Sequence, residues 1–262
     1  MTIRTGDQTK PMHFEFTGRT SVVTGAAHGF GRAICLAFAT HGANVLACDV
    51  LEDELLETQR LCHAAGGSCT ARMLDVRDKN AVDTLVADTG PVDILVNNAG
   101  GVLGQVGRPL EAVTPEEWQA IFDVNVTGAF YLAQAVAPAM KAARFGRIVN
   151  ISSGAGLGIS LTGIQAYAAA KAAQIGLTRQ LAHELGPWDI TVNDIAPGFV
   201  RSNSTTERQW ESYGEDGQRA LIDKIALKRL GSPDDIAHGV LFFASAYANW
   251  ITGQVLSIDG GK

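Results

Sequence analysis

The sequence lacks the features that mark disulfide frameworks and metal sites. Its four cysteines, Cys35, Cys48, Cys62 and Cys69, have no Cys-x-x-Cys spacing, and the first two fall inside predicted core elements. We therefore expect reduced, buried thiols rather than disulfides or metal ligands. The six histidines have no metal-binding spacing either, so no metal is expected.

Long apolar runs and basic stripes are also missing. No uninterrupted apolar run reaches the ~18 residues of a membrane span, and residues 1–14 form an N-terminal extension that is too polar for a signal peptide. The formal net charge is −6, and no basic stripe could neutralise phosphates. Linkers, low-complexity tracts and repeats are missing as well. We therefore expect one cytoplasmic domain over residues 1–262, with no membrane and no nucleic acid among its partners.

What the sequence does contain is a regular alternation of strand-like and helix-like segments. Nearly continuous aliphatic or β-branched runs predict strands near 20–24, 44–49, 69–74, 92–97, 147–152, 190–195 and 255–258. Helical patterns fill the gaps near 30–42, 52–65, 78–88, 115–142, 165–186, 206–227 and 233–246, with Thr114 as the N-cap of the fourth. Strands that are apolar throughout are covered on both faces, which is typical of parallel sheets. The pattern predicts an α/β fold, a single-domain Rossmann-type doubly wound sheet of about seven parallel strands with helices on both faces.

A glycine-rich turn follows the first predicted strand and precedes the first predicted helix. Glycines in this position let the backbone approach a pyrophosphate, and the N–H groups and dipole of the helix point toward it. The second predicted strand ends at Asp49, within about 20 residues of the last glycine, where a carboxylate can bond a ribose diol. The turn therefore predicts a dinucleotide site. Its residues are Thr24, Gly25, Ala26, Ala27, His28, Gly29, Phe30 and Gly31.

A proton-transfer site is indicated by Tyr167 and Lys171, which stand four residues apart and share one face of a helix. A phenol has an ordinary pKa of about 10, and a neighbouring cation favours the phenolate, so we expect Lys171 to lower the pKa of Tyr167. Ser153, at the end of an apolar run, can hold the oxygen that gains or loses the proton. Ser152 competes for that role, but alternation along the strand points the two serines to opposite faces.

With these residues and several further motifs, the chain resembles a member of the short-chain dehydrogenase/reductase family over nearly its whole length. The run Asn97-Asn98-Ala99-Gly100 is similar to the family's signature after the fourth strand, and Pro197-Gly198-Phe199-Val200 to its turn beside the nicotinamide. The resemblance implies a catalytic set of Asn125, Ser153, Tyr167 and Lys171. It implies cofactor contacts from Thr24, Gly25, His28, Gly29, Phe30, Gly31, Asp49, Asp75, Val76, Asn98, Ala99, Gly100, Tyr167, Lys171, Pro197, Gly198, Val200 and Ser202.

Several of these residues also have a purely structural interpretation. Asn125 can be a buried amide that joins helix to sheet, and Asn97 is expected mainly to brace the central sheet. Asp75 can cap a helix that begins at Arg77, whereas the resemblance gives Asp75 and Val76 contacts with the adenine. Both interpretations of Asp75 remain open, because capping and adenine contact are compatible.

NAD is the expected cofactor. An acidic side chain at the end of the second strand repels a 2′-phosphate, and neither Val50 nor Leu51 after Asp49 supplies a compensating cation. His28 is the nearest potential phosphate partner. The resemblance implies that hydride passes between a carbinol carbon and the nicotinamide while Tyr167 exchanges the hydroxyl proton, and that Lys171 also bonds the nicotinamide ribose.

The substrate is expected to be a small molecule. The predicted lid, 199–228, is long and polar, which favours a sugar, polyol or hydroxy acid as substrate. The alternative enzyme activity is 3-oxoacyl-[acyl-carrier-protein] reduction, which is common in the family. Arg144 stands where a carrier-docking basic residue is expected, but Trp188-Asp189 stands at the other such place. A second alternative is a non-catalytic NAD-binding regulator on the same fold.

The predicted helices 115–142 and 165–186 carry apolar residues beyond one face, as at Phe130 and Leu132 on the first and at Ile175 and Leu177 on the second. A helix that is apolar more than halfway round requires a second packing partner. The resemblance implies that these helices, and the segment 250–262, form contacts between subunits. We therefore expect a homotetramer, with a dimer as the alternative.

Overall fold

The structure, a computed structural model, describes residues 13–262, and most of the predicted N-terminal extension lies outside the described residues. Its sheet contains β1 (Thr20–Thr24), β2 (Asn44–Asp49), β3 (Ser68–Met73), β4 (Ile94–Asn97), β5 (Gly146–Ile151), β6 (Ile190–Pro197) and β7 (Val255–Ile258). The strand order is β3-β2-β1-β4-β5-β6-β7, and all neighbouring strands are parallel. The predicted seven-stranded parallel sheet is confirmed, with strand ends that differ from those predicted by at most two residues.

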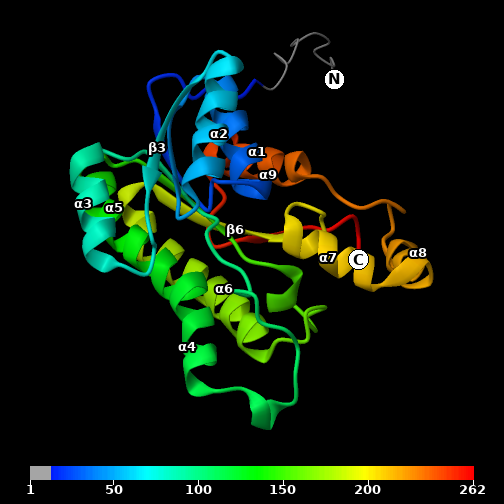
Figure 1. Ribbon diagram of the computed structural model, residues 1–262. Coiled ribbons are helices and arrows are strands. Elements are labelled where there is room, and N and C mark those ends of the chain that lie inside the picture. Colours follow the sequence, from blue (N-terminus) through cyan, green and yellow to red (C-terminus); the bar gives the residue numbers. More distant parts are fainter. Residues whose placement is uncertain (1–12) are drawn as a thin grey trace, which may run out of the picture.

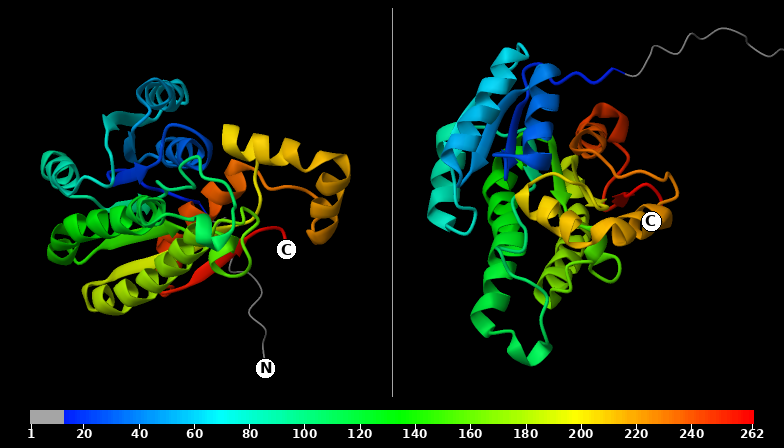
Figure 2. Two further views of the ribbon diagram at one scale, coloured as in Figure 1. Left: turned by 60° about the horizontal axis from the view of Figure 1, so that its bottom comes forward. Right: turned by 45° about the vertical axis from the view of Figure 1, so that its right-hand side comes forward.

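Helices cover both faces of the sheet (Figures 1 and 2). One face carries α1 (Gly29–Thr40), α2 (Glu52–Ala64) and α9 (Pro233–Ala244), and the other carries α3 (Lys79–Thr89), α5 (Gly128–Ala143) and α6 (Gln165–Leu185). The predicted arrangement with helices on both faces is therefore confirmed. α7 (Ser204–Ser212) and α8 (Gly214–Lys224) form an excursion beside the carboxyl ends of the strands, at the right of Figure 1.

The hydrophobic core is split by the sheet into two clusters. Along β5, every residue is buried, and successive side chains alternate between the two faces. Ile148 packs with the cluster under α3, α5 and α6, whereas Val149 packs with the cluster under α1 and α9. This double coverage explains why the strand sequences are apolar without alternation.

The predicted helix over 115–142 contains a wider turn in its middle. α4 (Pro115–Phe122) passes through a π-helical turn, η2 (Asp123–Thr127), into α5. Its start is as predicted: Thr114 caps the helix, since its hydroxyl accepts from the Glu117 N–H and the Glu117 carboxylate accepts from the Thr114 N–H at 3.0 Å. Single π-turns inside α-helices are frequent at functional sites, and this one contains Asn125.

The prediction of one helix over 206–227 is wrong. The segment forms α7 and α8, which are separated at Gly214, where φ is +60°. A left-handed residue turns the chain out of a right-handed helix, so Gly214 ends one helix axis and starts another. The lid therefore consists of two short helices at an angle (Figure 1).

Among residues 13–262, one helix meets the length and composition required to cross a membrane. The continuous helical stretch Pro115–Ala143 has 29 residues and a mean hydropathy of 1.3 in its most apolar window. That window is 39% buried within the structure. A single apolar helix packed on a sheet satisfies the same criteria, so this feature is weak evidence for a membrane span.

Candidate active site

The carboxyl ends of the parallel strands lie along one edge of the sheet, and the candidate site residues lie at or just beyond those ends. They include Thr24 on β1, Asp49 on β2, Asn97 on β4 and, two residues beyond β5, Ser153. α6 brings its side chains to the same edge, because the Lys171 Nζ donates to the carbonyl oxygen of Ile151, the last residue of β5, at 2.9 Å. Residues far apart in the sequence thus converge where parallel sheets bind ligands.

The glycine-rich turn between β1 and α1 is packed so closely that it excludes side chains. Gly25 and Gly29 have φ values of +65° and +55°, which favour glycine. A Cβ at Gly31 would lie 2.0 Å from the carbonyl oxygen of Gly25. The N-cap of α1, His28, makes no side-chain capping hydrogen bond. The first N–H groups of α1 are therefore available to an anion such as a pyrophosphate, and the turn fits a dinucleotide.

Thr24 and Asn98 hold this turn in place from beneath. The Thr24 hydroxyl accepts from the N–H groups of Asn98 and Ala99 at 3.1 and 3.0 Å. The Asn98 amide donates to the carbonyl oxygens of Thr24 and Gly25 at 2.9 and 3.0 Å. Asn97 points into the core and donates to Asn150 Oδ1 at 2.9 Å, as expected of a residue that braces the sheet.

Asp49 lies at the end of β2 and links this strand to the glycine-rich turn. Its Oδ2 accepts from the Ala27 N–H at 2.9 Å, and its Oδ1 accepts from the Val50 and Leu51 N–H groups at 2.7 and 3.2 Å. A carboxylate offers about four acceptor positions, so one remains for a ribose hydroxyl. The carboxylate is therefore fixed in position and retains acceptor capacity for the predicted contact.

The interpretation of Asp75 as a helix cap is wrong. α3 begins at Lys79, and its N-cap is Asp78, whose carboxylate accepts from the N–H groups of Asn80 and Ala81. Asp75 instead accepts from the Arg77 N–H at 3.0 Å and pairs with the Arg77 guanidinium at 2.6 Å. The sequence pattern places the start of the helix too early, because more than one aspartate before it is able to cap. The predicted adenine contact of Asp75 and Val76 stays a prediction.

Ser152 and Ser153 point in different directions, as strand alternation predicts. The Ser152 side chain is buried and donates to Asp194 Oδ1 inside the core. Ser153 lies at the crevice, where its hydroxyl accepts from the Ala155 N–H at 3.1 Å and interacts with the Tyr167 phenol. Ser153 is therefore the serine that faces the candidate acid/base group.

On α6, Lys171 is buried and Tyr167 is partly buried. The Lys171 Nζ lies 5.8 Å from the centroid of the Tyr167 ring. Burial raises the pKa of the Tyr167 phenol, and the Ser153 hydrogen bond opposes that rise. Burial lowers the pKa of Lys171 to about 8, and the Asp194 carboxylate opposes that fall. Burial therefore sets the direction of the Tyr167 shift, and the expected effect of Lys171 on that pKa stays a prediction.

Asn125 is fully buried, and its amide hydrogen-bonds only to backbone groups. Its Oδ1 accepts from the Gly101 N–H at 2.9 Å, and its Nδ2 donates to the carbonyl oxygens of Gly101 and Ile121 at 2.9 and 2.8 Å. These bonds tie η2 to the loop that follows β4, which is the structural role considered for it. A Cβ at Gly100 would lie 2.5 Å from Asn125 Oδ1 and 3.3 Å from Lys171 Nζ, so Asn125 borders the site.

The turn after β6 closes the crevice from above. Gly198 donates its N–H to the Ile258 carbonyl oxygen at 3.0 Å, and a Cβ on Gly198 would meet the Asp259 backbone at 2.7 Å. A Cβ at Gly29 would meet the Ser202 carbonyl oxygen at 2.8 Å. The predicted segment from Pro197 to Ser202 therefore lies directly against the dinucleotide turn.

Charged side chains of the lid pair with one another within the lid. Arg201 pairs with Glu207 at 2.7 Å and lies over the Trp210 ring, and Arg219 pairs with Asp216 at 2.5 Å. Exposed aliphatic side chains come from the segments 103–110 and 157–161 and from residue 227. They are Leu103, Val106, Leu110, Leu157, Ile159, Leu161 and Leu227, each at least 46% exposed. Isolated apolar residues in loops give no periodic signal, so a sequence pattern does not reveal them.

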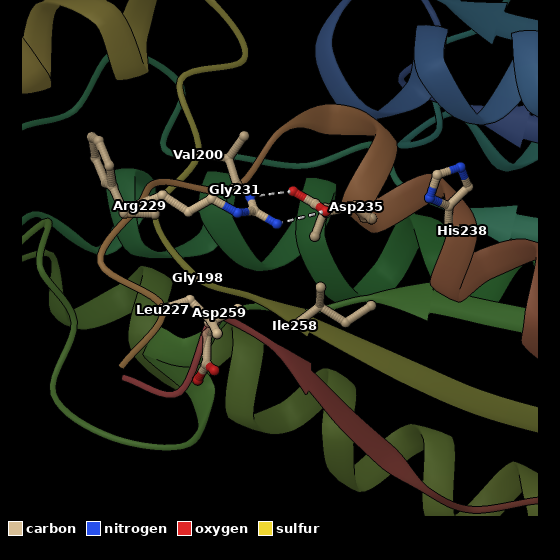
Figure 3. A pocket seen from close by; sticks show the side chains of 12 residues that line it. Gly198, Val200, Leu227, Arg229, Gly231, Asp235, His238, Ile258 and Asp259 are labelled. Atoms are coloured by element: carbon tan, nitrogen blue, oxygen red, sulfur yellow. Dashed lines mark hydrogen bonds and ion pairs between the residues drawn. The ribbon is translucent and has the colours of Figure 1, made fainter. Parts of the chain in front are cut away.

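Two hollows in the described chain lie away from the catalytic candidates. One, of about 240 Å³, lies beneath the lid, and the Arg229–Asp235 ion pair forms part of its wall (Figure 3). Gly198 and Val200 link this hollow to the turn after β6. A larger groove of about 640 Å³ lies at the opposite, amino-terminal edge of the sheet. We place the reaction at Tyr167 because parallel sheets bind ligands at the carboxyl edge.

Two buried polar residues beside Lys171 were not predicted. Gln174 accepts from Lys171 Nζ at 3.1 Å, and Asp194 lies within the core on β6. The available signal was an aspartate inside a segment that is predicted to be a strand buried on both faces, 190–195. Such a residue is costly to bury unless it is hydrogen-bonded or has a function.

Fold and site together define an NAD(P)-dependent oxidoreductase that acts on CH–OH groups. The chain belongs to the short-chain dehydrogenase/reductase family: residues 25–262 match a family profile described as enoyl-(acyl carrier protein) reductase.

Relatives with different substrates share this fold. The chain is 37% identical over 248 residues to a 3-oxoacyl-[acyl-carrier-protein] reductase of Thermotoga maritima, and the match covers 93% of this chain and 97% of that protein. A solved structure of a candidate NAD(P)-dependent gluconate 5-dehydrogenase from Beutenbergia cavernae, with bound NADP, has a TM-score of 0.86 and 36% identity, covering 95% and 98% of the two chains. A 3-oxoacyl-[acyl-carrier protein] reductase from Brucella melitensis, with bound NAD, has a TM-score of 0.86 and 34% identity, covering 100% and 97%.

Proposed function

We propose that the protein is an NAD-dependent oxidoreductase that interconverts a secondary alcohol and a ketone on a small polar substrate, namely a sugar, polyol or hydroxy acid. The observation that carries this proposal is the convergence of Ser153, Tyr167 and Lys171 beside a turn that fits a dinucleotide. NAD supplies the hydride acceptor when bound, held by the turn and by Asp49.

In this proposal the chain's own residues orient the substrate oxygen and move one proton. Tyr167 accepts the hydroxyl proton during oxidation and returns it during ketone reduction. Ser153 donates a hydrogen bond to the same oxygen, where negative charge develops. Lys171 stabilises the phenolate form of Tyr167 and can bond the nicotinamide ribose, and Asn125 is the candidate for holding a relay water. Because burial raises the pKa of Tyr167, the resting group is a phenol, which is the form required for ketone reduction.

The preference for NAD is tested by Asp49→Ala. Removing this carboxylate removes the group that repels a 2′-phosphate, so the ratio of kcat/KM with NADP to kcat/KM with NAD should rise at least ~10-fold. Asp53→Ala is the matched control, because it removes an equal charge from the exposed first turn of α2 without touching the strand end. Faster turnover with NADP than with NAD by the wild-type protein would contradict the preference.

The substrate class is tested with a panel of sugars, polyols, hydroxy acids and simple secondary alcohols, scored by NADH absorbance. Relatives include a candidate gluconate 5-dehydrogenase, and the lid contributes polar groups above the site. Since Arg201 and Arg219 are already paired with carboxylates, we expect neutral polyols to be used in preference to anionic hydroxy acids. A panel in which only the simple secondary alcohols react would refute the polar substrate class.

The second candidate is 3-oxoacyl-[acyl-carrier-protein] reduction, and the exposed aliphatic side chains of the segment 157–161 favour it. Leu157 and Ile159, which are 51% and 98% exposed, could contact an acyl chain. Docking of an acidic carrier is less well supported, because Arg144 is paired with Asp189 at 2.8 Å. Reduction of a 3-oxoacyl thioester with no turnover of polyols would establish this candidate. A non-catalytic NAD-binding regulator, the remaining alternative, would bind NAD and show no turnover with any substrate.

We also propose that the chain assembles as a homotetramer, with a dimer as the alternative. Phe130 on α5 is 40% exposed, and Trp250 in the C-terminal segment is 98% exposed. Light scattering should give four times the 27.7 kDa chain mass. Trp250→Ala should shift the species toward dimers, whereas Ile159→Ala, at an equally exposed apolar residue, should not. A fully active monomer would refute this assembly.

A further inference from the structure

Asp194 is a carboxylate in the interior of the sheet. It lies in the middle of β6, has no solvent exposure, and is the only acidic side chain that is fully buried among residues 13–262. Its neighbours on β6 show which face it occupies: Val192 packs in the cluster under α6, and Ile195 packs in the cluster under α9. Strand alternation therefore directs Asp194 toward α6, the helix that carries Tyr167 and Lys171.

Two hydroxyl groups hold the carboxylate. Ser152 donates to Asp194 Oδ1, and Thr178 on α6 lies 3.4 Å from Oδ2. Ser152 precedes Ser153 in the chain, and Thr178 also donates to the carbonyl oxygen of Gln174, the residue that accepts from Lys171. Within the described structure, Asp194 is therefore connected through Ser152 to Ser153, and through Thr178 and Gln174 to Lys171.

Lys171 is the only fully buried amine among the same residues, with 3% of its surface exposed. Its Nζ donates to two neutral acceptors, the Ile151 carbonyl oxygen at 2.9 Å and Gln174 Oε1 at 3.1 Å. An isolated ammonium is costly to bury, and neutral acceptors alone do not supply an opposite charge. Asp194 supplies it, since the attraction between the two groups opposes the effect of burial on both pKa values.

The side chains that hydrogen-bond to Asp194 are neutral, and so are the two acceptors of Lys171. The side chains that contact the Asp194 carboxylate are the hydroxyls of Ser152 and Thr178, and the backbone N–H of Asp194 donates to the Gln254 carbonyl oxygen at 2.9 Å. Lys171 is the charged group whose attraction lowers the pKa of Asp194. The causes of the Tyr167 pKa shift are burial and the Ser153 hydrogen bond, so the effect of Lys171 on the phenolate is taken from the proposed function.

We propose that Asp194 is a positioning residue for catalysis: its buried carboxylate keeps Lys171 in the charged form, through which Lys171 stabilises the Tyr167 phenolate. This inference rests on the proposed roles of Tyr167 and Lys171. Burial raises the pKa of Asp194 to about 7, while that of Lys171 is about 8. Both groups therefore change charge near neutral pH, and the carboxylate supports the ammonium only once it has ionised.

The test is the pH profile of alcohol oxidation in Asp194→Asn. Oxidation requires the phenolate, so kcat rises with pH through the apparent pKa of the Tyr167–Lys171 pair. Asn preserves the volume and can bond Ser152 and Thr178 but carries no charge, so Lys171 loses its proton at lower pH and the phenolate forms at higher pH. We expect the midpoint to move up by about one pH unit, which lowers kcat about tenfold at pH 7 and restores it at alkaline pH. KM for NAD should not change.

Two further variants keep the test decisive. Thr191→Val changes a buried polar residue of the same strand without removing charge, and its profile should match the wild type. Ser152→Ala leaves Asp194 in place but removes a hydrogen bond that favours its ionised form, so it should move the midpoint in the same direction by a smaller amount, even if Asp194→Asn does not fold. Unchanged midpoints in Asp194→Asn and Ser152→Ala would overturn the inference.

The proposed function is tested separately by Tyr167→Phe. If that variant still oxidises the alcohol, the acid/base assignment fails and the role of Asp194 fails with it. If that variant is inactive while the folded Asp194→Asn protein retains the wild-type profile, only the role of Asp194 is overturned.

Discussion

Replacing Tyr167 with Phe is expected to lower kcat by ~10²–10⁴-fold, the usual contribution of a general acid/base, while NAD binding stays unchanged. The phenyl ring preserves the packing of this partly buried side chain and removes only the hydroxyl that is proposed to exchange the proton. This substitution leaves the glycine-rich turn and Asp49 untouched. Measurement of kcat with the best alcohol of the panel, and of NAD affinity by fluorescence titration, separates chemistry from binding.

The structure offers a matched comparison for this variant. Tyr213 is a lid tyrosine that packs against Phe199 with ring centroids 5.9 Å apart, and its hydroxyl accepts from Gln209 at 2.7 Å. Tyr213→Phe removes a phenol of the same kind outside the proposed proton path, so kcat should fall much less. Comparable activity of Tyr167→Phe and the wild type would rule out Tyr167 as the acid/base group.

The sheet could be predicted from the sequence because its strands are buried on both faces. In β5 and β6 every residue is buried, so aliphatic side chains occur on both faces of each strand. Helix starts are also predictable where a hydroxyl side chain and proline stand together, as at Thr114 and Pro115. Since parallel strands share one carboxyl edge, predicting the strands placed the ends of β1, β2 and β5 together, and with them the dinucleotide turn, Asp49 and Ser153.

Features that depend on tertiary contacts were not accessible in this way. The π-helical turn η2 occurs where Asn125 forms hydrogen bonds with the loop after β4. The composition of the lid indicates polar groups that are open to a substrate, but Arg201 is already paired with Glu207. A charged neighbour alone predicts a lowered pKa for Tyr167, whereas burial, which no local pattern specifies, sets the direction of the shift.

Gly31→Ala is expected to disrupt the dinucleotide turn. A Cβ at this residue would lie 2.0 Å from the Gly25 carbonyl oxygen, 2.7 Å from the Gly25 carbonyl carbon and 2.8 Å from the Ala26 Cα. These are backbone atoms of the turn itself, so rotation of a side chain cannot relieve the overlap. Overpacking of this kind costs ~1–3 kcal/mol. For a domain of this size, each kcal/mol lowers Tm by ~2–4 °C.

The same displacement should weaken cofactor binding, because the turn must open where the pyrophosphate is expected. If ~1.4 kcal/mol of this strain is present only when NAD is bound, the NAD dissociation constant rises about tenfold. Gly186→Ala is the control, since Gly186 has right-handed helical backbone angles and a Cβ there would meet no atom within 4 Å beyond its own local backbone. That control should retain the wild-type Tm and NAD affinity. A Gly31→Ala protein that binds NAD as tightly as the wild type would show that the pyrophosphate does not lie on this turn, even though the glycines there exclude side chains.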